Sequence, residues 1–274
     1  MLVSAGMKRA YVSMLCGGSR YTPGAEVLGR SLVESGSTAE RILLVTRDVP
    51  TEARARLSGQ GWSLRLVEPI ANPRPERQML PRFANVFTKL RAWELAELDR
   101  VVLLDADTLV LDNVDDLFDR PGFAAAPDFF LPDRFNSGVI VLSPSRDTFG
   151  RMVDALADAS GYDGGDQGFL NDFFGEWYAM PSAHRLPVGY NTPNFIFQFM
   201  HGHPQVRETI EREVKILHYL VQKPWLASST LTGASAPWWR RYYDLHPEEA
   251  TKLQRRVHAA EDWTFEHLAR LVVG

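Results

Sequence analysis

Two acidic side chains separated by one residue, Asp105 and Asp107, come directly after the apolar run Val101–Leu104. Such a run is typical of a strand buried on both faces, and in open α/β sheets ligands bind beyond the carboxyl ends of the strands. Mg²⁺ and Mn²⁺ bind one or two carboxylates together with phosphate oxygens of a substrate. The spacing therefore predicts a metal site; the alternative is that Asp107 caps the next segment and Asp105 makes a turn hydrogen bond.

A histidine and a lysine further along the chain suit the same chemistry. His218 closes the predicted strand Val214–Leu217, where its imidazole can act as a third metal ligand. Lys223 precedes Pro224 and Trp225 on a stiffened turn, and lysine is a point-charge partner for phosphate. The alternatives are a hydrogen-bonded core histidine and a surface lysine beside a core tryptophan.

Two glycine-bearing segments carry polar side chains that suit sugar hydroxyl groups. Gly164–Gly168 opens a predicted helix with Asp166 near its N-cap, and Phe135–Gly138 precedes a predicted strand. The glycines admit a ligand, whose hydroxyl groups can then hydrogen-bond to Asp166 and Gln167. The alternatives are an ordinary helix cap and a simple turn.

The sequence lacks the motifs of several large enzyme classes. Gly17 and Gly18 follow the first predicted strand, but no G-x-G-x-x-G is present, so the nicotinamide-binding fingerprint is absent. There is also no Walker lysine motif and no G-x-S-x-G. No motif marks Cys16 as a nucleophile.

Composition and charge narrow the class of protein further. The 274 residues include 30 basic and 34 acidic side chains, which give a net charge of −4. A general nucleic-acid-binding protein is typically basic, so this charge argues against that class. A single cysteine favours a reducing compartment. The longest wholly apolar runs are far shorter than the roughly 20 residues of a membrane span, and no apolar region follows Lys8 and Arg9 to make a signal peptide. We therefore expect a cytoplasmic protein without a membrane span.

Short β-rich runs alternate with amphipathic segments, a pattern typical of βαβ units around a mostly parallel sheet. We expect one α/β domain over residues 1–274, with a core at about 9–225 and a helical C-terminal extension at 226–274. An exposed loop is expected over Ala71–Arg82, an irregular segment over Leu186–Met200 and a polar helix over Pro247–Val273. The predicted strands are Ala10–Leu15, Arg41–Thr46, Trp62–Val67, Val101–Leu104, Thr108–Leu111, Gly122–Ala126, Gly138–Leu142 and Val214–Leu217. The predicted helices are Gly24–Glu34, Pro50–Gly59, Asn85–Leu98, Val114–Phe118, Asp147–Ala159 and Gln167–Phe174.

A series of short motifs follows one another along most of the chain. They are Asp105–Leu111, Asp115–Asp119, Ala125–Asp128, Phe135–Val139, Gly164–Gly168, Leu186–Pro187 with Tyr190–Asn191, and His218 with Lys223–Trp225. In this order they resemble the glycogenin-like members of glycosyltransferase family 8, over a span from about Tyr11 to Trp225. The resemblance implies a Rossmann-like GT-A fold, a UDP-sugar donor carrying glucose or galactose, a Mn²⁺ ion with Mg²⁺ as the alternative, and transfer with retention at the anomeric carbon.

The resemblance also implies roles for individual residues. The residues that match metal ligands are Asp105, Asp107 and His218. The candidates for catalysis are Asp166, Gln167 and Lys89. The residues that match donor-binding positions are Met14, Leu15, Tyr21, Arg82, Lys89, Ala106, Asp128, Asn136, Ser137, Asp166, Gln167 and Lys223.

These residue types suit the departure of a nucleoside diphosphate, because a divalent ion and Lys223 stabilise the charge that builds on its oxygen atoms. Retention requires either a carboxylate nucleophile or attack from the same face by an acceptor hydroxyl whose proton passes to the leaving phosphate. For Asp166 and Gln167 we favour a positioning role over covalent capture of the sugar.

The acceptor is expected to be a separate molecule: a sugar, a cyclitol or a small metabolite with a hydroxyl group. Glycogenin-like proteins glucosylate one of their own tyrosines, whereas Gln198 holds the matching position here and no tyrosine lies between Tyr190 and Tyr219. The alternatives are a self-glucosylating protein, a metal-dependent sugar nucleotidyltransferase and a non-catalytic binding module. The aromatic run Trp238–Tyr243 is interpreted as packing against the core with exposed arginines, and a homodimer is left open.

Overall fold

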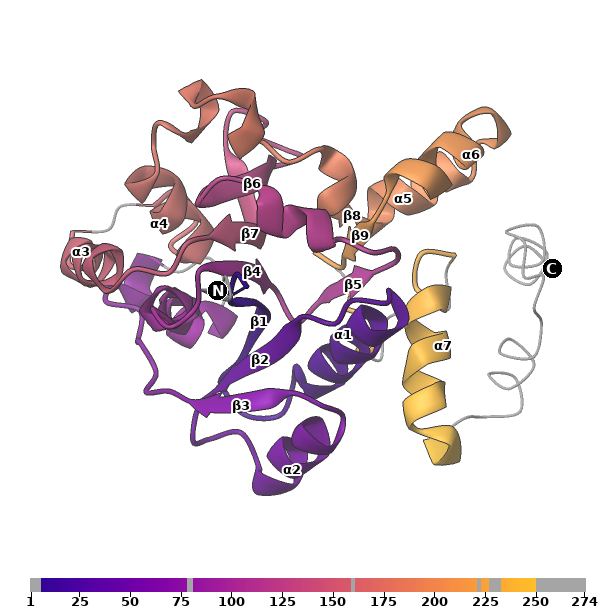
Figure 1. Cartoon of the computed structure of the whole chain (residues 1–274), viewed down its shortest axis with the longest axis horizontal. Helices are drawn as coiled ribbons and strands as arrows, with labels where there is room; N and C mark the ends of the chain where they lie inside the picture. Colours follow the sequence, from indigo (N-terminus) through magenta and orange to yellow (C-terminus); the bar gives the residue numbers. More distant parts are fainter. Residues whose placement is uncertain (1–5, 78–80, 159–160, 221–222, 227–232, 250–274) are drawn as a thin grey trace, which may run out of the picture.

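The computed structural model describes residues 6–77, 81–158, 161–220, 223–226 and 233–249. The strands of its larger sheet are β1 (Arg9–Leu15), β2 (Glu40–Val45), β3 (Ser63–Leu66), β4 (Arg100–Leu104), β6 (Phe123–Pro127) and β7 (Phe135–Leu142). They lie in the order β3-β2-β1-β4-β7-β6 (Figure 1). The first four are parallel, β7 is antiparallel to both of its neighbours, and β6 therefore runs in the direction of the first four. The predicted α/β fold with a mostly parallel sheet is confirmed.

Helices cover both faces of this sheet because its strands bury both sets of alternating side chains. The helices are α1 (Thr22–Glu34), α2 (Thr51–Gly59), η2 (Pro81–Glu94), η3 (Asp115–Asp119), α3 (Arg146–Leu156) and α4 (Asp166–Phe173). In β1, Tyr11 and Leu15 pack with α1, α2 and η3, whereas Ala10 and Val12 pack with η2, α3 and α4. The strand thus lies in the middle of three layers, with its carboxyl end free to meet a ligand.

A second, smaller sheet lies beyond the carboxyl end of β4. It consists of β5 (Thr108–Val110), β8 (Thr192–Pro193) and β9 (Ile216–His218), in the order β5-β9-β8. In the antiparallel pair β5–β9, Thr108 is opposite His218, and in the parallel pair β8–β9, Pro193 is opposite His218. This register carries His218 to the acidic turn that precedes β5.

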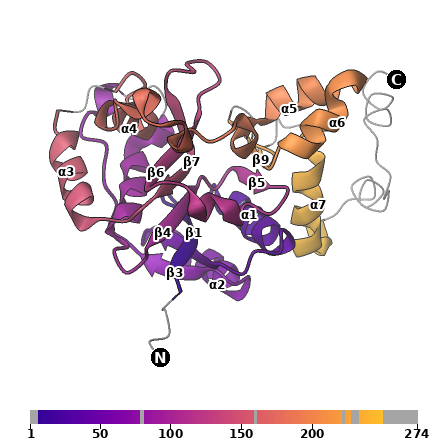
Figure 2. The same cartoon turned by 45° about the horizontal axis from the view of Figure 1, so that its top comes forward.

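The C-terminal helices are α5 (Asn194–His201), α6 (Pro204–Glu213) and α7 (Ala236–Leu245). α7 lies alongside α1, and α5 and α6 extend from the small sheet (Figures 1 and 2). Trp238 and Tyr243 of α7 are buried, and Arg241 Nε lies 2.7 Å from Glu34 Oε2 of α1. Core packing of this aromatic run is therefore confirmed, but Arg241 is half-buried and ion-paired instead of exposed. Among the described helices, none combines the length and apolar character needed to cross a bilayer.

Several predicted elements were wrong in detail. The segment predicted as the helix Asn85–Leu98 is 3-10 helix that ends at Glu94, where the carbonyl of Trp93 accepts the N-cap amide of α3 from Ser145. The predicted loop Ala71–Arg82 contains the short helix η1 (Pro75–Arg77) and the start of η2.

Two further corrections concern segments beside the site. Phe135–Gly138 forms the first half of β7 instead of preceding it. The segment predicted to be irregular, Leu186–Met200, contains β8 and most of α5. The phenylalanines of α5 are spaced two residues apart and give no helical pattern, so its packing against α6 decides its structure. Of the predicted helix Pro247–Val273, residues 250–273 lie outside the described part of the chain, and Pro247–Glu249 form the 3-10 turn η7.

Candidate active site

The turn between β4 and β5 presents the carboxylates of Asp105 and Asp107. Backbone groups hold this turn: Asp105 N donates to Gly138 O at 2.9 Å, and Thr108 N and Oγ1 donate to Asp105 O at 3.0 and 2.8 Å. The turn thus uses the carbonyl of Asp105 and leaves its carboxylate for other partners. The alternative in which Asp105 makes a side-chain turn hydrogen bond is therefore not what the structure shows.

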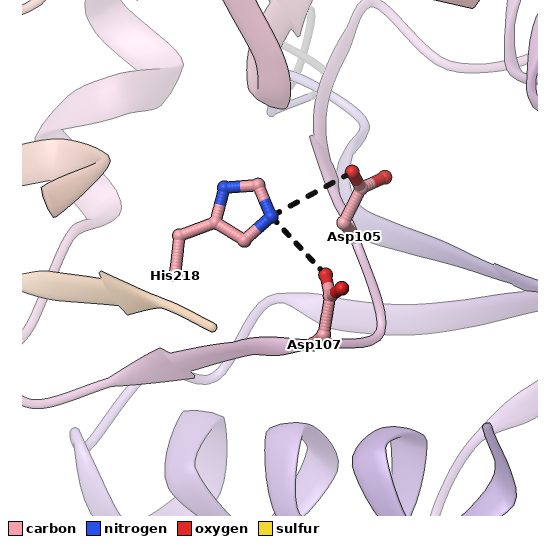
Figure 3. A group of neighbouring side chains, drawn as sticks. All are labelled: Asp105, Asp107 and His218. Atoms are coloured by element: carbon pink, nitrogen blue, oxygen red, sulfur yellow. Dashed lines mark ion pairs between the residues drawn. The ribbon is translucent and has the colours of Figure 1, made fainter. Parts of the chain in front are cut away.

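The imidazole of His218 faces both carboxylates (Figure 3). Its Nε2 lies 3.2 Å from Asp107 Oδ1 and 4.0 Å from Asp105 Oδ2. The three side chains each offer one ligand atom within 4.8 Å of the others. The three residues predicted as metal ligands thus meet at one point, although His218 is far from the two aspartates in the sequence.

A chain of hydrogen bonds determines which nitrogen of His218 carries the proton. Asn136 Nδ2 donates to the carboxylate of Asp128 at 3.1 Å, and Asn136 Oδ1 accepts from Gly138 N at 3.0 Å, so the orientation of this amide is fixed. Asn191 must then direct its Nδ2 at Asn136 Oδ1, 2.9 Å away, and its Oδ1 at His218 Nδ1, also 2.9 Å away. Because Asn191 Oδ1 can only accept, His218 Nδ1 carries the proton.

In the neutral form of the ring, His218 Nε2 consequently presents a lone pair to the acidic pair. Within the described part of the chain, Asp107 Oδ1 is buried without a hydrogen-bond donor. Carboxylate oxygens suit Mg²⁺ and Mn²⁺, and neutral imidazole is a common metal ligand. A divalent cation among these atoms would turn the repulsion between their lone pairs into attraction, so the residues fit such an ion.

Lys89 links the acidic turn to the start of α4. Its buried Nζ lies 2.7 Å from Asp105 Oδ1 and 2.6 Å from Asp166 Oδ2, and it donates to Ser137 O and Oγ at 3.2 and 3.3 Å. Burial lowers the pKa of Lys89, but the two carboxylates outweigh it and raise the pKa above its ordinary value. Burial raises the pKa of Asp105. Lys89 therefore stays charged and holds the two carboxylates together.

Lys223 lies on the other side of the acidic turn. Its Nζ is ion-paired with Asp107 Oδ2 and donates to the carbonyl oxygens of Tyr219 and Leu220. Burial raises the pKa of Asp107, but Lys223, together with His218 when its ring is protonated, outweighs burial and lowers the pKa well below its ordinary value. Asp107 is consequently a carboxylate with a cation already beside it.

A polar group next to the acidic turn surrounds the amide of Gln167. Gln167 Oε1 accepts from Ser137 N at 3.2 Å, which fixes the orientation of this amide. Its Nε2 donates to Asp128 Oδ2 at 3.2 Å and to the hydroxyl oxygen of Tyr162 at 2.7 Å. Together with Asn136, these side chains form a set of donors and acceptors of the kind that binds sugar hydroxyl groups.

Residues 12–122 match the sequence profile described as glycosyl transferase family 8. Glycogenin-1 of Caenorhabditis elegans is 36% identical over 259 residues, which cover 93% of this chain and 59% of that protein. The chain is therefore similar to glycosyl transferase family 8 over residues 12–122 and to glycogenin-1 over most of its length.

A second relative in sequence and a similar solved structure carry the names of different glycosyltransferases. UDP-glucuronate:xylan alpha-glucuronosyltransferase 1 of Arabidopsis thaliana is 32% identical over 227 residues, which cover 80% of this chain and 32% of that protein. The chain spans less than two thirds of the length of these two relatives. The structure of the galactosyltransferase LgtC with donor and acceptor sugar analogs is 20% identical and superimposes with a TM-score of 0.60, covering 90% of this chain and 99% of that one. This likeness confirms the predicted GT-A fold.

Most of the remaining residues predicted to bind the donor lie around the ends of β1 and β4. Leu15 packs its side chain in the core, Met14 is half-buried, and Ala106 is buried between the two aspartates. Tyr21 directly precedes α1 and packs edge-on against Trp225, with ring centroids 5.6 Å apart. The side chain of Arg82 lies outside the described part of the chain.

Two residues of the site did not emerge from sequence reasoning. Asn191 was present in the Tyr190–Asn191 motif, but nothing in the sequence indicated that it orients His218. Tyr162 lies five residues before Gln167, and no motif marked it. Both contacts depend on tertiary packing, so only hydrogen-bond geometry reveals them.

Proposed function

We propose that the protein transfers a hexose from a UDP-sugar to a hydroxyl group of a separate acceptor, with Mn²⁺ held by Asp105, Asp107 and His218. The observation that carries this proposal is the convergence of two carboxylates and an imidazole lone pair at the carboxyl edge of the sheet. The similarity to family 8 supports glycosyl transfer as the reaction class.

A divalent ion at this point supplies electrostatic stabilisation for the charge on the departing diphosphate. Lys223, ion-paired with Asp107, lies within reach of a phosphate group bound at the acidic turn. It would add a second positive charge there. Lys89 instead compensates Asp105 and Asp166, so its role would be to hold the carboxylates in position.

For retention we propose attack by the acceptor hydroxyl from the face that the diphosphate leaves. Asp166 Oδ2 is already bound by Lys89 and by Ser137 Oγ, at 2.6 and 3.0 Å. These contacts weaken the carboxylate as a nucleophile and favour a positioning role for Asp166. The fixed amide of Gln167 would position the sugar beside it.

The charges of the polar group favour a neutral hexose as the transferred sugar. The side chains that donate to Asp128 are the amides of Asn136 and Gln167, and the ammonium group of Lys89 is already paired with two carboxylates. This acidic lining is unfavourable for the carboxylate of a glucuronate. We therefore propose glucose or galactose as the sugar, in spite of the glucuronosyltransferase relative.

A separate acceptor is supported by the surroundings of Tyr190 and Tyr219, the tyrosines on either side of Gln198. Tyr190 is buried and donates to Asp116 at 2.5 Å, and Tyr219 is buried and donates to Ala234 O at 2.8 Å. Burial and Asp116 raise the pKa of Tyr190 to about 12. Neither phenol is exposed for glycosylation.

The test is the release of UDP from UDP-glucose, UDP-galactose and UDP-glucuronate, with Mn²⁺, with Mg²⁺ and with a chelator. We expect Mn²⁺-dependent release from one of the neutral donors, lost in Asp107→Asn and retained in Asp112→Asn, a change at an exposed aspartate of the same segment. Absence of metal-dependent release from all three donors would refute the proposal. Intact mass after incubation with donor checks self-glycosylation, for which a ladder of hexose additions is the signature.

A further inference from the structure

Three phenylalanine side chains form an aromatic wall on the surface: Phe129, Phe130 and Phe195. Phe129 and Phe130 are 50% and 69% exposed, and the neighbouring Leu131 is 44% exposed. The ring of Phe195 packs against both, with centroids 5.7 Å from Phe129 and 6.2 Å from Phe130. Contiguous exposed apolar surface of this kind commonly marks a binding site.

The aromatic wall is continuous with the candidate active site through two separate segments. Asp128 Oδ1 accepts the backbone amides of Phe130 and Leu131 at 2.9 and 3.3 Å, while its Oδ2 accepts from Gln167. One carboxylate therefore holds both the aromatic loop and the amide at the site. The loop connects β6 to β7, and its ring contacts with Phe195 join it to the first turn of α5.

The second segment is β8, which leads directly into α5. Pro193 of β8 is paired with His218, the candidate metal ligand, and Phe195 follows two residues later. The aromatic wall is thus linked on one side to Asp128 of the polar group. On the other side it is linked, through Pro193, to His218.

A hydroxyl group completes this surface on its polar side. Tyr162 is 46% exposed, and its oxygen accepts from Gln167 Nε2 at 2.7 Å. Since the orientation of the Gln167 amide is fixed by Ser137 N, the hydroxyl proton of Tyr162 must point away from Gln167. An oxygen atom of a ligand beside Gln167 could accept that proton.

We propose that the aromatic wall and the Tyr162 hydroxyl form the acceptor subsite, and that the acceptor is a pyranoside. This inference rests on the proposed glycosyl transfer. A pyranose has an apolar face of C–H groups, which suits the negative face of an aromatic ring, and a rim of hydroxyl groups, which suits Asp128 and Tyr162. A purely apolar ligand would leave these polar groups unused.

The transfer step balances with the groups already described. The acceptor oxygen forms a bond to the anomeric carbon as the bond from that carbon to the diphosphate oxygen breaks. The electron pair of the broken bond leaves with UDP, and the proton of the acceptor hydroxyl passes to the departing diphosphate. The aromatic wall takes no part in this chemistry and only holds the acceptor.

The first experiment is saturation-transfer NMR on the full chain with maltotriose, cellotriose and xylotriose, in the presence of UDP and Mn²⁺. We expect transfer to the ring C–H protons of at least one trisaccharide. In the double variant Phe129→Ala with Phe130→Ala, the affinity of the protein for that trisaccharide should be about tenfold lower. Tyr178→Ala, a change at an aromatic side chain that is 59% exposed outside the wall, should leave it unchanged.

The second measurement separates this inference from the proposed function. Hydrolysis of UDP-glucose in the absence of an acceptor should be the same in the double variant and in the original protein, whereas the KM for the trisaccharide should rise about tenfold. Tyr162→Phe, which keeps the ring, should raise the KM for the trisaccharide.

Three outcomes would overturn the acceptor subsite. One is hydrolysis of the donor with no binding of the trisaccharides; another is equal affinity in the double variant. The third is a hexose adduct mapped to Tyr162, which would make this residue the acceptor itself. If the original protein does not hydrolyse any UDP-sugar donor, the proposed function is refuted instead. The NMR experiment then still shows whether the aromatic wall binds saccharides.

Discussion

Asn191 offers the sharpest test of how the candidate metal site is built. In Asn191→Leu, His218 Nδ1 loses its acceptor and Asn136 Oδ1 loses a donor, two hydrogen bonds of 2.9 Å each. The imidazole proton can then move to Nε2, where it donates to Asp107 Oδ1 at 3.2 Å. A hydrogen bond to a charged group contributes about 1.5–3 kcal/mol, and a cation must displace it before it can bind.

The expected result is a fall of about 10- to 100-fold in Mn²⁺ affinity, the range found when partners of ligating histidines are removed. This range corresponds to about 1.4–2.7 kcal/mol and agrees with the hydrogen-bond value. Asn191→Asp keeps an acceptor toward Nδ1 and should retain most of the affinity. Titration of Mn²⁺ by electron paramagnetic resonance in the presence of UDP measures both variants.

The control is Asn113→Leu, which removes hydrogen bonds of a half-buried asparagine to Ser35 O and Asp115 N, none of them to His218. Thermal unfolding shows whether each variant is folded. Wild-type Mn²⁺ affinity in folded Asn191→Leu would refute the tautomer argument. Equal losses in the leucine and aspartate variants would refute it too, because they would assign the effect to packing alone.

Three further predictions concern other parts of the site. In Gly138→Ala the new Cβ would lie 2.2 Å from His218 Cε1, so the ring must move and Mn²⁺ binding should be lost while the protein stays folded, as titration and circular dichroism would show. In Lys89→Met the two carboxylates lose their shared cation, and the free energy of unfolding, measured in urea, should fall by about 3–5 kcal/mol; a change below 1 kcal/mol would contradict the buried ion pairs. Burial raises the pKa of Cys16 to about 11, so its alkylation by iodoacetamide should be slow at pH 8 and increase about tenfold per pH unit up to that value; fast alkylation at pH 8 would show that the thiol is not buried.

Much of the parallel sheet could be predicted from the sequence, because its signals are local. Val101–Leu104 is apolar at every position, which predicted β4, and the acidic turn follows it directly. The predicted bounds of β1 and β2 also lie within one residue of the observed bounds, because each strand buries apolar side chains on both faces of the sheet. A strand buried on both faces has a composition that depends little on which segments cover it.

Segments whose structure depends on tertiary contacts were predicted less well. The segment Leu186–Met200 was expected to be irregular, although α5 lies within it, and α6 did not emerge from the sequence at all. β7 begins at Phe135, whereas the segment Phe135–Gly138 was expected to precede the strand. Polar residues lie in this strand because partners from distant segments bind them: Asn191 donates to Asn136, and Asp166 accepts from Ser137. Local patterns cannot indicate this compensation.

The amino-acid sequence by itself determined which residue types are available at the carboxyl edge of the sheet, since Asp105 and Asp107 must lie wherever β4 ends. The register of β5 against β9 brings His218 to these aspartates. The hydrogen bond to Asn191 places a proton on Nδ1 of its imidazole. The aromatic wall likewise depends on the packing of Phe195 of α5 against the loop that follows β6. These contacts join segments distant in sequence, and each is determined by packing and hydrogen-bond geometry that no local pattern of residues records.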